Sequence, residues 1–247
     1  MHTFQEFRGY SWLMLAGLAL SIVFWSRIAR RDGRLLPVYV GAVLGAFFGA
    51  KVCYFAAEGW MKIGSPGFWL DLATGKTILG AMLGGYLGVE GAKKAVGYKQ
   101  PTGDWFAMIA PAGIILGRVG CMLHGCCPGR VFESPHWFTM MGSDGVHRWP
   151  AVPAEIAFNG VALLTALALR RARLLAGQHF HLYLIAYGLF RFGHEFLRGT
   201  PRLLGPFSGY HVLALAVAML GLVRFYQRKR GGEGQFKKEI DSQIERR

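Results

Sequence analysis

The composition of this chain of 247 residues is typical of a membrane protein. Apolar residues make up 53% of it and charged residues only 17%, whereas a soluble domain usually carries about 25% charged residues. The 28 Lys and Arg against 14 Asp and Glu give a formal net charge of +14. Because the basic residues lie between apolar runs, they favour an anionic membrane surface over nucleic acid as the partner.

Apolar runs of spanning length predict an all-α, polytopic membrane protein. A helix needs about 20 mostly apolar residues to cross a hydrocarbon core. We expect about seven spans, at approximately Tyr10–Trp25, Pro37–Ala57, Thr77–Val96, Trp105–Cys121, Pro153–Leu169, His179–Phe196 and Gly209–Phe225. We assign residues 1–230 to one transmembrane domain and expect the polar segment 231–247 to be a solvated or disordered cytoplasmic tail.

The distribution of Lys and Arg predicts the orientation of these spans. Most of the basic residues follow the first, third, fifth and seventh spans. The positive-inside rule places those segments in the cytoplasm, so we expect the amino terminus outside and the carboxyl terminus inside. Two long loops then lie on the outer side, Glu58–Lys76 and Pro128–Val152, and their aromatic residues favour contact with the outer leaflet.

Glycines recur at four-residue spacing in the second and third spans. They are Gly41, Gly45 and Gly49, followed by Gly80, Gly84 and Gly88. This small-xxx-small pattern lets two helix backbones approach closely, and we expect packing of that kind rather than a glycine-lined ligand groove.

Several polar side chains interrupt the apolar spans. They are Lys51, Arg118, His124, Arg191, His194 and Glu195. A charge at the bilayer centre costs about 2.5–3.5 kcal/mol, so these groups must face the bundle interior or a wet cavity. Arg191 and Glu195 are spaced i, i+4 and can form an ion pair that is purely structural. We expect Arg118 and Arg191 to line one cavity, nearer the outer face.

The segment from Gly117 to Arg130 concentrates reactive side chains where an apolar helix gives way to a Gly-rich turn. It holds two guanidinium groups, three thiols and one imidazole, at Arg118, Arg130, Cys121, Cys126, Cys127 and His124. Irregular backbone at membrane depth is tolerated only where it is buried in protein or lines a cavity. The pattern indicates a site that binds an anion beside a nucleophile or a base.

This segment resembles the signature of the phosphatidylglycerol–prolipoprotein diacylglyceryl transferases of bacterial plasma membranes, Gly-Arg-x-Gly-Asn-x-x-Asn-Gly-Glu-x-x-Gly-Arg. The positions in register are Gly117, Arg118, Gly120, Gly125, Gly129 and Arg130. The likeness covers nearly the whole chain. Other family motifs match at Arg8 and Tyr10, Gly49 and Lys51, Pro150 and Glu155, and Arg191, Glu195, Phe196 and Arg198.

The chain also departs from the family pattern. Leu79 stands where the family has a histidine regarded as catalytically important, and Trp149 replaces the histidine of its His-Pro motif. Cys121, His124 and Cys126 replace two asparagines and one glutamate of the signature. The chain is thus similar to a divergent branch with a Gly-Cys-x-x-x-Gly-Cys-Cys core.

The resemblance implies a transferase that needs no cofactor or metal. It moves a diacylglyceryl group from phosphatidylglycerol to the lipobox cysteine thiol of a secreted preprotein and releases glycerol phosphate. Arg118 and Arg191 would stabilise the charge on the departing phosphate. A base must take the acceptor's proton, because a free cysteine with a pKa of about 8.5 is mostly neutral at pH 7. His124 is our first choice, and Glu195 or His194 the second.

The resemblance adds further residues to the catalytic set and to the phospholipid-binding set. Tyr10 joins the catalytic group, while Lys51, Gly129 and Arg130 join Arg118 and Arg191 in binding the phospholipid.

Three other classes of function remain open. The Cys121, His124, Cys126 and Cys127 side chains are of the type that holds metal or takes part in redox chemistry, although zinc sites usually draw on two separated pairs. Intramembrane charges also mark transporters, but the chain shows no internal repeat. A lipid-binding relative without transferase activity is a third alternative.

Overall fold

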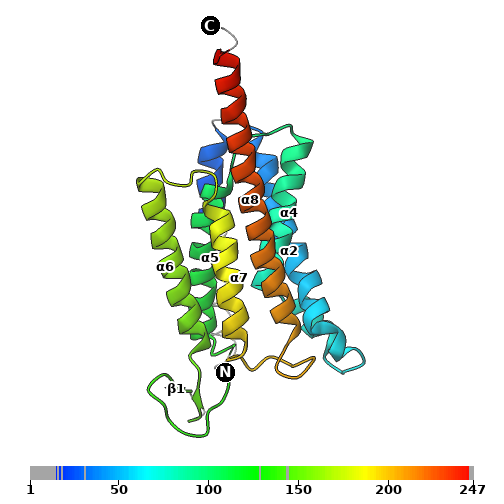
Figure 1. The fold of residues 1–247 in the computed structure, drawn as a ribbon. Helices are drawn as coiled ribbons and strands as arrows, with labels where there is room; N and C mark the ends of the chain where they lie inside the picture. Colours follow the sequence, from blue (N-terminus) through cyan, green and yellow to red (C-terminus); the bar gives the residue numbers. More distant parts are fainter. Residues whose placement is uncertain are drawn as a thin grey trace.

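The structure is a computed structural model that describes residues 15, 17, 19–30, 32–127, 129–142 and 145–244, with the side chains of the last helix described as far as Arg228. It is a bundle of long helices with a small hairpin at one end (Figure 1). The long helices are α2 (Leu35–Ala57), α4 (Ile78–Ala95), α5 (Gly103–Leu123), α6 (Ala151–Arg171), α7 (His179–Glu195) and α8 (Gly209–Ile244). A shorter apolar helix, Ala19–Ala29, precedes them. The expectation of a helical protein is confirmed.

Four of the described helices are long and apolar enough to span a membrane. They are α2, α5, α6 and the part of α8 from Gly209 to Arg228. Helices α4 and α7 have 18 and 17 residues, slightly fewer than the roughly 20 that a spanning helix needs. The chain is therefore a helical membrane protein, and the count of seven spans with its orientation stays a prediction.

Helices α2 and α4 pack through the six glycines singled out above. A Cβ atom added to Gly41 would lie 2.7 Å from the carbonyl oxygen of Gly88, and one added to Gly49 would lie 2.7 Å from Cα of Gly84. Real Cβ atoms do not come so close, so only glycine fits at these positions. The prediction of close helix packing is confirmed.

The core between α4, α5, α7 and α8 is mostly apolar and aromatic. Leu79, Leu184, Tyr187 and Ala214 are completely buried in it. Leu79, which stands where the resemblance would place a histidine, is thus packed in the core.

The two long loops both contain short regular elements. The first holds η1 (Gly59–Lys62) and α3 (Phe68–Thr74), and the second holds the antiparallel hairpin of β1 (Met140–Met141) and β2 (His147–Arg148). Trp69 is 77% exposed and Trp137 95% exposed. Large exposed rings at one end of the bundle support the predicted contact with lipid headgroups.

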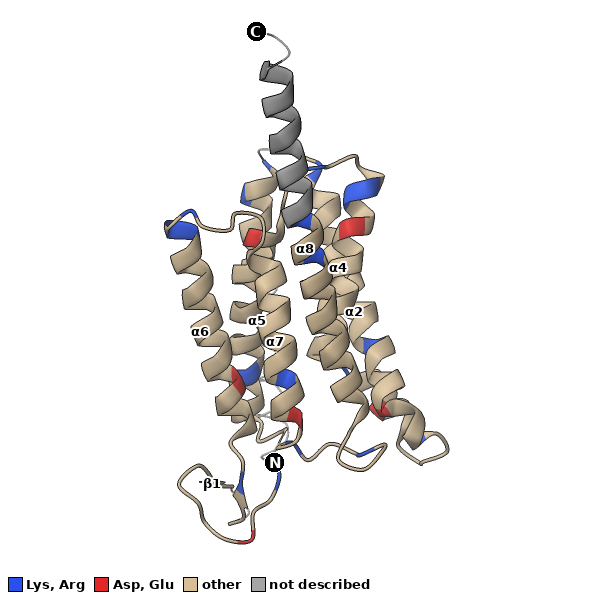
Figure 2. Ribbon diagram, in the orientation of Figure 1, with Lys and Arg blue, Asp and Glu red and all other residues tan. Residues whose placement is uncertain are grey.

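Charged residues gather at the two ends of the bundle (Figure 2). Basic residues predominate at one end, at the end of α4, in the turn after α6 and at Arg224 and Arg228 of α8, with Glu90 and Asp104 among them. A mixed group of acidic and basic residues lies inside the opposite end, where α5, α6 and α7 approach the hairpin. The functional site must be sought at this second end, because buried charge there requires a reason.

Helix α8 is longer than the predicted span, which ends at Phe225. Helix α8 continues without a break through the polar segment to Ile244. The segment contains Lys, Glu and Gln, which have good helix propensity, together with three glycines. Its assignment as a solvated or disordered cytoplasmic tail stays a prediction.

Candidate active site

Arg118 lies in the second-last turn of α5 and is buried with 8% exposure. Its Nη2 atom is 2.7 Å from Oε2 of Glu155, a carboxylate with 0% exposure in the first turns of α6. A buried pair of this kind is held firmly, because removing either partner would leave an uncompensated charge in a medium of low dielectric constant.

A second ion pair lies on α7 beside the first. Arg191 Nη2 is 2.9 Å from Oε2 of Glu195, as the i, i+4 spacing predicted. Arg198, in the segment after α7, approaches both carboxylates, at 3.7 Å from Glu155 Oε2 and 3.8 Å from Glu195 Oε2. Three guanidinium groups therefore share two carboxylates, and the cluster carries one net positive charge.

Hydroxyl groups fix both carboxylates in place. The Tyr187 hydroxyl donates to Glu155 Oε1 at 2.6 Å. The Thr200 hydroxyl donates to Glu195 Oε1, and the Ser208 hydroxyl does so at 3.2 Å. Carboxylates that accept several hydrogen bonds are stabilised in their ionised form. Glu155 and Glu195 thus serve as anchors for the arginines.

The arginines keep donors free. In the described part of the chain, the Nε atoms of Arg118 and Arg191 are buried and have no hydrogen-bond partner, whereas Nε of Arg198 makes the 3.8 Å ion contact with Glu195. Buried polar groups in proteins are nearly always hydrogen-bonded, so unpaired guanidinium donors need an explanation. Together with the net positive charge, they favour an anion as the missing partner.

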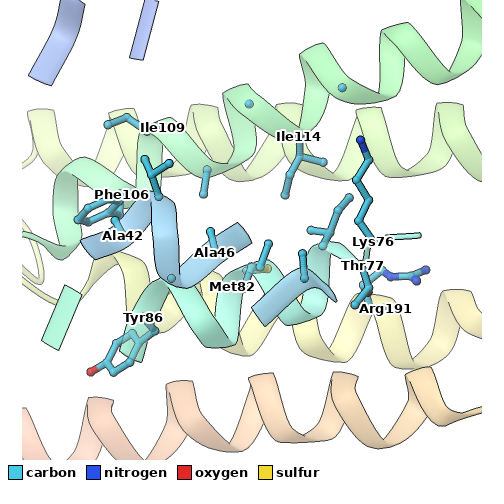
Figure 3. Close-up of a pocket in the computed structure, with 18 of the residues that line it drawn as sticks. Ala42, Ala46, Lys76, Thr77, Met82, Tyr86, Phe106, Ile109, Ile114 and Arg191 are labelled. Atoms are coloured by element: carbon cyan, nitrogen blue, oxygen red, sulfur yellow. The ribbon is translucent and has the colours of Figure 1, made fainter. Parts of the chain in front are cut away.

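A cavity of about 750 Å³ reaches this cluster from inside the bundle. Figure 3 shows Lys76, Thr77 and Arg191 at one end and Phe106 and Tyr86 at the other. The wall between them is apolar, with Ala42, Ala46, Met82, Ile109 and Ile114. Arg118 and Arg191 both line the cavity, so their predicted convergence is confirmed. The middle of the cavity is thus apolar, and Arg118 and Arg191 line one end of it.

The three cysteines lie together beside Arg118. The Sγ atoms of Cys121, Cys126 and Cys127 are within 4.8 Å of one another, and Arg118 Nη1 is 3.9 Å from Cys121 Sγ. Helix α5 ends at Leu123, and Gly125 and Cys127 have φ angles of +64° and +61°. Hydrogen bonds from the Cys121 and Cys126 thiols, aided by the charge of Arg118, hold the pKa of the Cys127 thiol below its ordinary value.

The predicted bases lie in different surroundings. His124 is exposed and does not line the cavity. His194 is buried, with Nδ1 3.3 Å from Arg191 Nη1 and its ring stacked on Phe190. Glu195 is held by the ion pair and hydroxyl contacts described above. The role of a base at any of these positions stays a prediction.

The other predicted lipid-binding residues are not gathered around the cavity. Lys51 donates to the backbone carbonyls of Leu72 and Ala73 and so fastens the end of α3. Gly129 forms an isolated β-bridge with Arg198, and the backbone N–H of Arg130 donates to Leu197 at 2.8 Å. These contacts tie the signature segment to the chain after α7. Tyr10 lies outside the described residues.

Sequence reasoning left several residues out of the site. Glu155 and Arg198 were noted only as motif matches, and Tyr187 and Asn159 were not singled out. Asn159 donates to the Glu155 carbonyl at 2.8 Å and accepts from the Tyr183 hydroxyl at 2.7 Å. A carboxylate and an amide four residues apart at the start of an apolar span were the signal that could have found them.

Glu58 is a further carboxylate that the sequence analysis did not single out. It directly follows α2 and lines the cavity. Burial raises the pKa of its carboxyl group, while the Lys62 ammonium and a hydrogen bond from the Tyr210 hydroxyl oppose that effect.

Comparison with known proteins supports one family. The family model for prolipoprotein diacylglyceryl transferase matches residues 2–227. The phosphatidylglycerol–prolipoprotein diacylglyceryl transferase of Geobacter sulfurreducens is 31% identical over 232 residues, which cover 88% of this chain and 89% of the relative. The enzyme of the same name from Clostridium tetani is 26% identical over 208 residues, covering 78% and 82%. That from Vibrio cholerae is 27% identical over 243 residues, covering 91% and 88%. The chain belongs to the prolipoprotein diacylglyceryl transferase family.

Proposed function

We propose that this protein transfers the diacylglyceryl group of phosphatidylglycerol to the cysteine thiol of a prolipoprotein. The observation that carries the proposal is the apolar cavity of about 750 Å³ that ends at Arg118 and Arg191. Acyl chains fit its apolar wall, and a phosphate fits the buried N–H donors at its end. The names of the relatives supply the same two substrates.

The reaction exchanges one bond for another at a glycerol carbon. The acceptor sulfur, as a thiolate, attacks this carbon, a C–S bond forms, and the C–O bond to the phosphate breaks. The electron pair of that bond leaves with glycerol phosphate. Arg118 and Arg191 stabilise the growing charge, and Glu155 and Glu195 hold the two guanidinium groups before the reaction begins. Preorganised donors of this kind are often the largest single contribution to catalysis.

The same proposal includes a location and a topology. The protein lies in the bacterial plasma membrane with seven spans, the amino terminus outside and the basic end of the bundle in the cytoplasm. Support comes from the gathering of basic residues at one end of the bundle (Figure 2) and from the positive-inside rule. The arginine cluster then faces the outer side, where secreted preproteins emerge.

The test is release of glycerol phosphate. The protein in lipid nanodiscs is incubated with phosphatidylglycerol, labelled in its headgroup glycerol, and a lipobox peptide. We expect Arg191→Gln to lower turnover by about 10²–10³-fold, because it removes a donor to the developing charge. Arg170→Gln is the matched control, since Arg170 stacks on Trp105, 4.1 Å from the ring centre, near the end of α6.

Each result bears on the proposal. Release that depends on the peptide, is lost in Arg191→Gln and is kept in Arg170→Gln supports it. Bound phosphatidylglycerol without any release would overturn it in favour of a lipid-binding protein.

A further inference from the structure

Three cysteine thiols lie close together at the end of the cavity. The Sγ atoms of Cys121, Cys126 and Cys127 are within 4.8 Å of one another. In a tetrahedral zinc site with Zn–S bonds of about 2.3 Å, two sulfurs are about 3.8 Å apart. Small side-chain rotations therefore suffice to bring all three sulfurs onto one cation.

The backbone turn after α5 creates this grouping. The N–H of Cys126 donates to the carbonyl of Cys121 at 3.1 Å, which folds the chain back onto the last turn of the helix. Gly125 and Cys127 complete the fold with left-handed φ angles. The turn thus brings together three thiols that lie within seven residues of the sequence.

The surrounding charge fits a cation bound by thiolates. Three thiolates and one divalent cation carry a net charge of −1. Arg118, whose Nη1 is 3.9 Å from Cys121 Sγ, provides a neighbouring positive charge. Arg198 lines the same cavity. The net charge of −1 on the complex is therefore offset by the net charge of +1 on the arginine cluster.

The site has three protein ligands and an open side. Among the described residues, no histidine nitrogen or carboxylate oxygen joins the three sulfurs, and all three cysteines line the cavity. Structural zinc sites are closed by four protein ligands, whereas catalytic ones keep one position for water or substrate. The arrangement matches the catalytic type.

We propose that Cys121, Cys126 and Cys127 bind Zn²⁺ or a similar closed-shell divalent cation, and that the fourth position takes the acceptor thiol as a thiolate. This inference rests on the proposed function. The acceptor thiol displaces water from the cation and loses its proton to solvent. Its sulfur then attacks the glycerol carbon, and the electron pair of the broken C–O bond leaves with glycerol phosphate toward Arg118 and Arg191. The cation keeps its oxidation state and does the work of a base, since a metal-bound thiol is deprotonated.

Metal binding is measured first, without reference to activity. The full-length protein in nanodiscs is stripped with a chelator, titrated with Co²⁺ and followed by the visible and thiolate charge-transfer absorption, then competed with Zn²⁺. We expect one equivalent per chain for the unchanged protein and at least about 100-fold weaker binding for Cys126→Ser and Cys127→Ser. Cys53→Ser is the matched control, because Cys53 is a free, partly buried thiol of α2 outside the cluster. Absence of thiolate absorption, or equal loss in Cys53→Ser, would overturn the site.

Transfer activity is then measured on the same samples. We expect the chelated protein to lose glycerol phosphate release and Zn²⁺ to restore it, while Arg191→Gln still binds Co²⁺ but stays slow. Full release by the chelated protein would overturn the role of the cation and leave the proposed transferase intact. Tight Co²⁺ binding in a protein that never releases glycerol phosphate would overturn the transferase and, with it, the catalytic role of the cation.

Discussion

Helices α2 and α4 meet through backbone atoms, whereas α5, α6 and α7 meet through charged and hydroxyl side chains at one end. Glycines let the two backbones approach closely in the first contact, with small apolar side chains such as Val38, Ala42 and Val89 packed beside them. In the second, Arg118 on α5 pairs with Glu155 on α6, which accepts from Tyr187 on α7. Lipid tails are as apolar as leucine, so helices in a membrane associate by close packing or by polar contacts. Close packing joins α2 and α4, which we call the glycine half of the bundle. Polar contacts join α5, α6 and α7, which we call the polar half.

The difference matters because the cavity lies between the halves. Its wall from α2 and α4 includes small or apolar residues such as Ala42, Ala46 and Met82, while α5 and α7 contribute Arg118 and Arg191. The glycine contact itself contributes no charged group to the arginine end of the cavity, although Tyr86, Glu90 and Lys93 of α4 line the cavity elsewhere. The polar network, in contrast, holds its arginines by carboxylates and leaves donors free for a ligand.

The largest effect is expected in the polar half, from Glu155→Gln. Loss of this charge leaves Arg118 and Arg198 short of a buried counter-charge, which should lower the free energy of unfolding by about 3–5 kcal/mol. Denaturant unfolding of the protein in detergent measures it. The control is Glu133→Gln on the exposed hairpin segment, for which a change within about 0.5 kcal/mol is expected. Equal stability of both variants would mean that this half is not held by charge.

A smaller effect is expected in the glycine half, from Gly84→Ala. The added Cβ would overlap the backbone of Gly45 and Gly49, so α2 and α4 must separate. Overpacking of this kind costs about 1–3 kcal/mol. Gly91→Ala on the same helix is the control, because nothing lies within 4 Å of its Cβ position. It should be neutral or stabilising by up to about 1 kcal/mol. If the two variants behave alike, close approach of the backbones is not what joins these helices.

The smallest effect concerns Glu58, between the end of α2 and Tyr210 of α8. Its pKa is raised above the ordinary 4.5 by burial, so the folded state holds this proton more tightly than the unfolded state. Stability should therefore fall as the pH rises from 4.5 through the raised pKa. Glu58→Gln should melt at a higher temperature than the unchanged protein at pH 7, with the difference disappearing below pH 4.5. A difference that is independent of pH would show that Glu58 acts through packing alone.

Features that depend on one helix were readable from the sequence. Apolar runs predicted the long helices from α2 to α7 with ends that differ by no more than two residues, whereas α8 continues to Ile244, well beyond the predicted Phe225. The i, i+4 spacing predicted the Arg191–Glu195 pair, and the glycine spacing predicted close packing. Each of these follows from the 3.6-residue period of the helix, which places nearby residues on a common face whatever the rest of the chain does.

Features that join different helices were decided by the tertiary structure. The partnership of Arg118 with Glu155, the bridging position of Arg198 and the exposure of His124 depend on how α5, α6 and α7 are rotated against one another. The meeting of three sulfurs likewise depends on two left-handed residues after α5. Sequence spacing determines which residues share a helix face. It leaves open which faces meet, because that is set by the packing of whole helices and by the turns that end them.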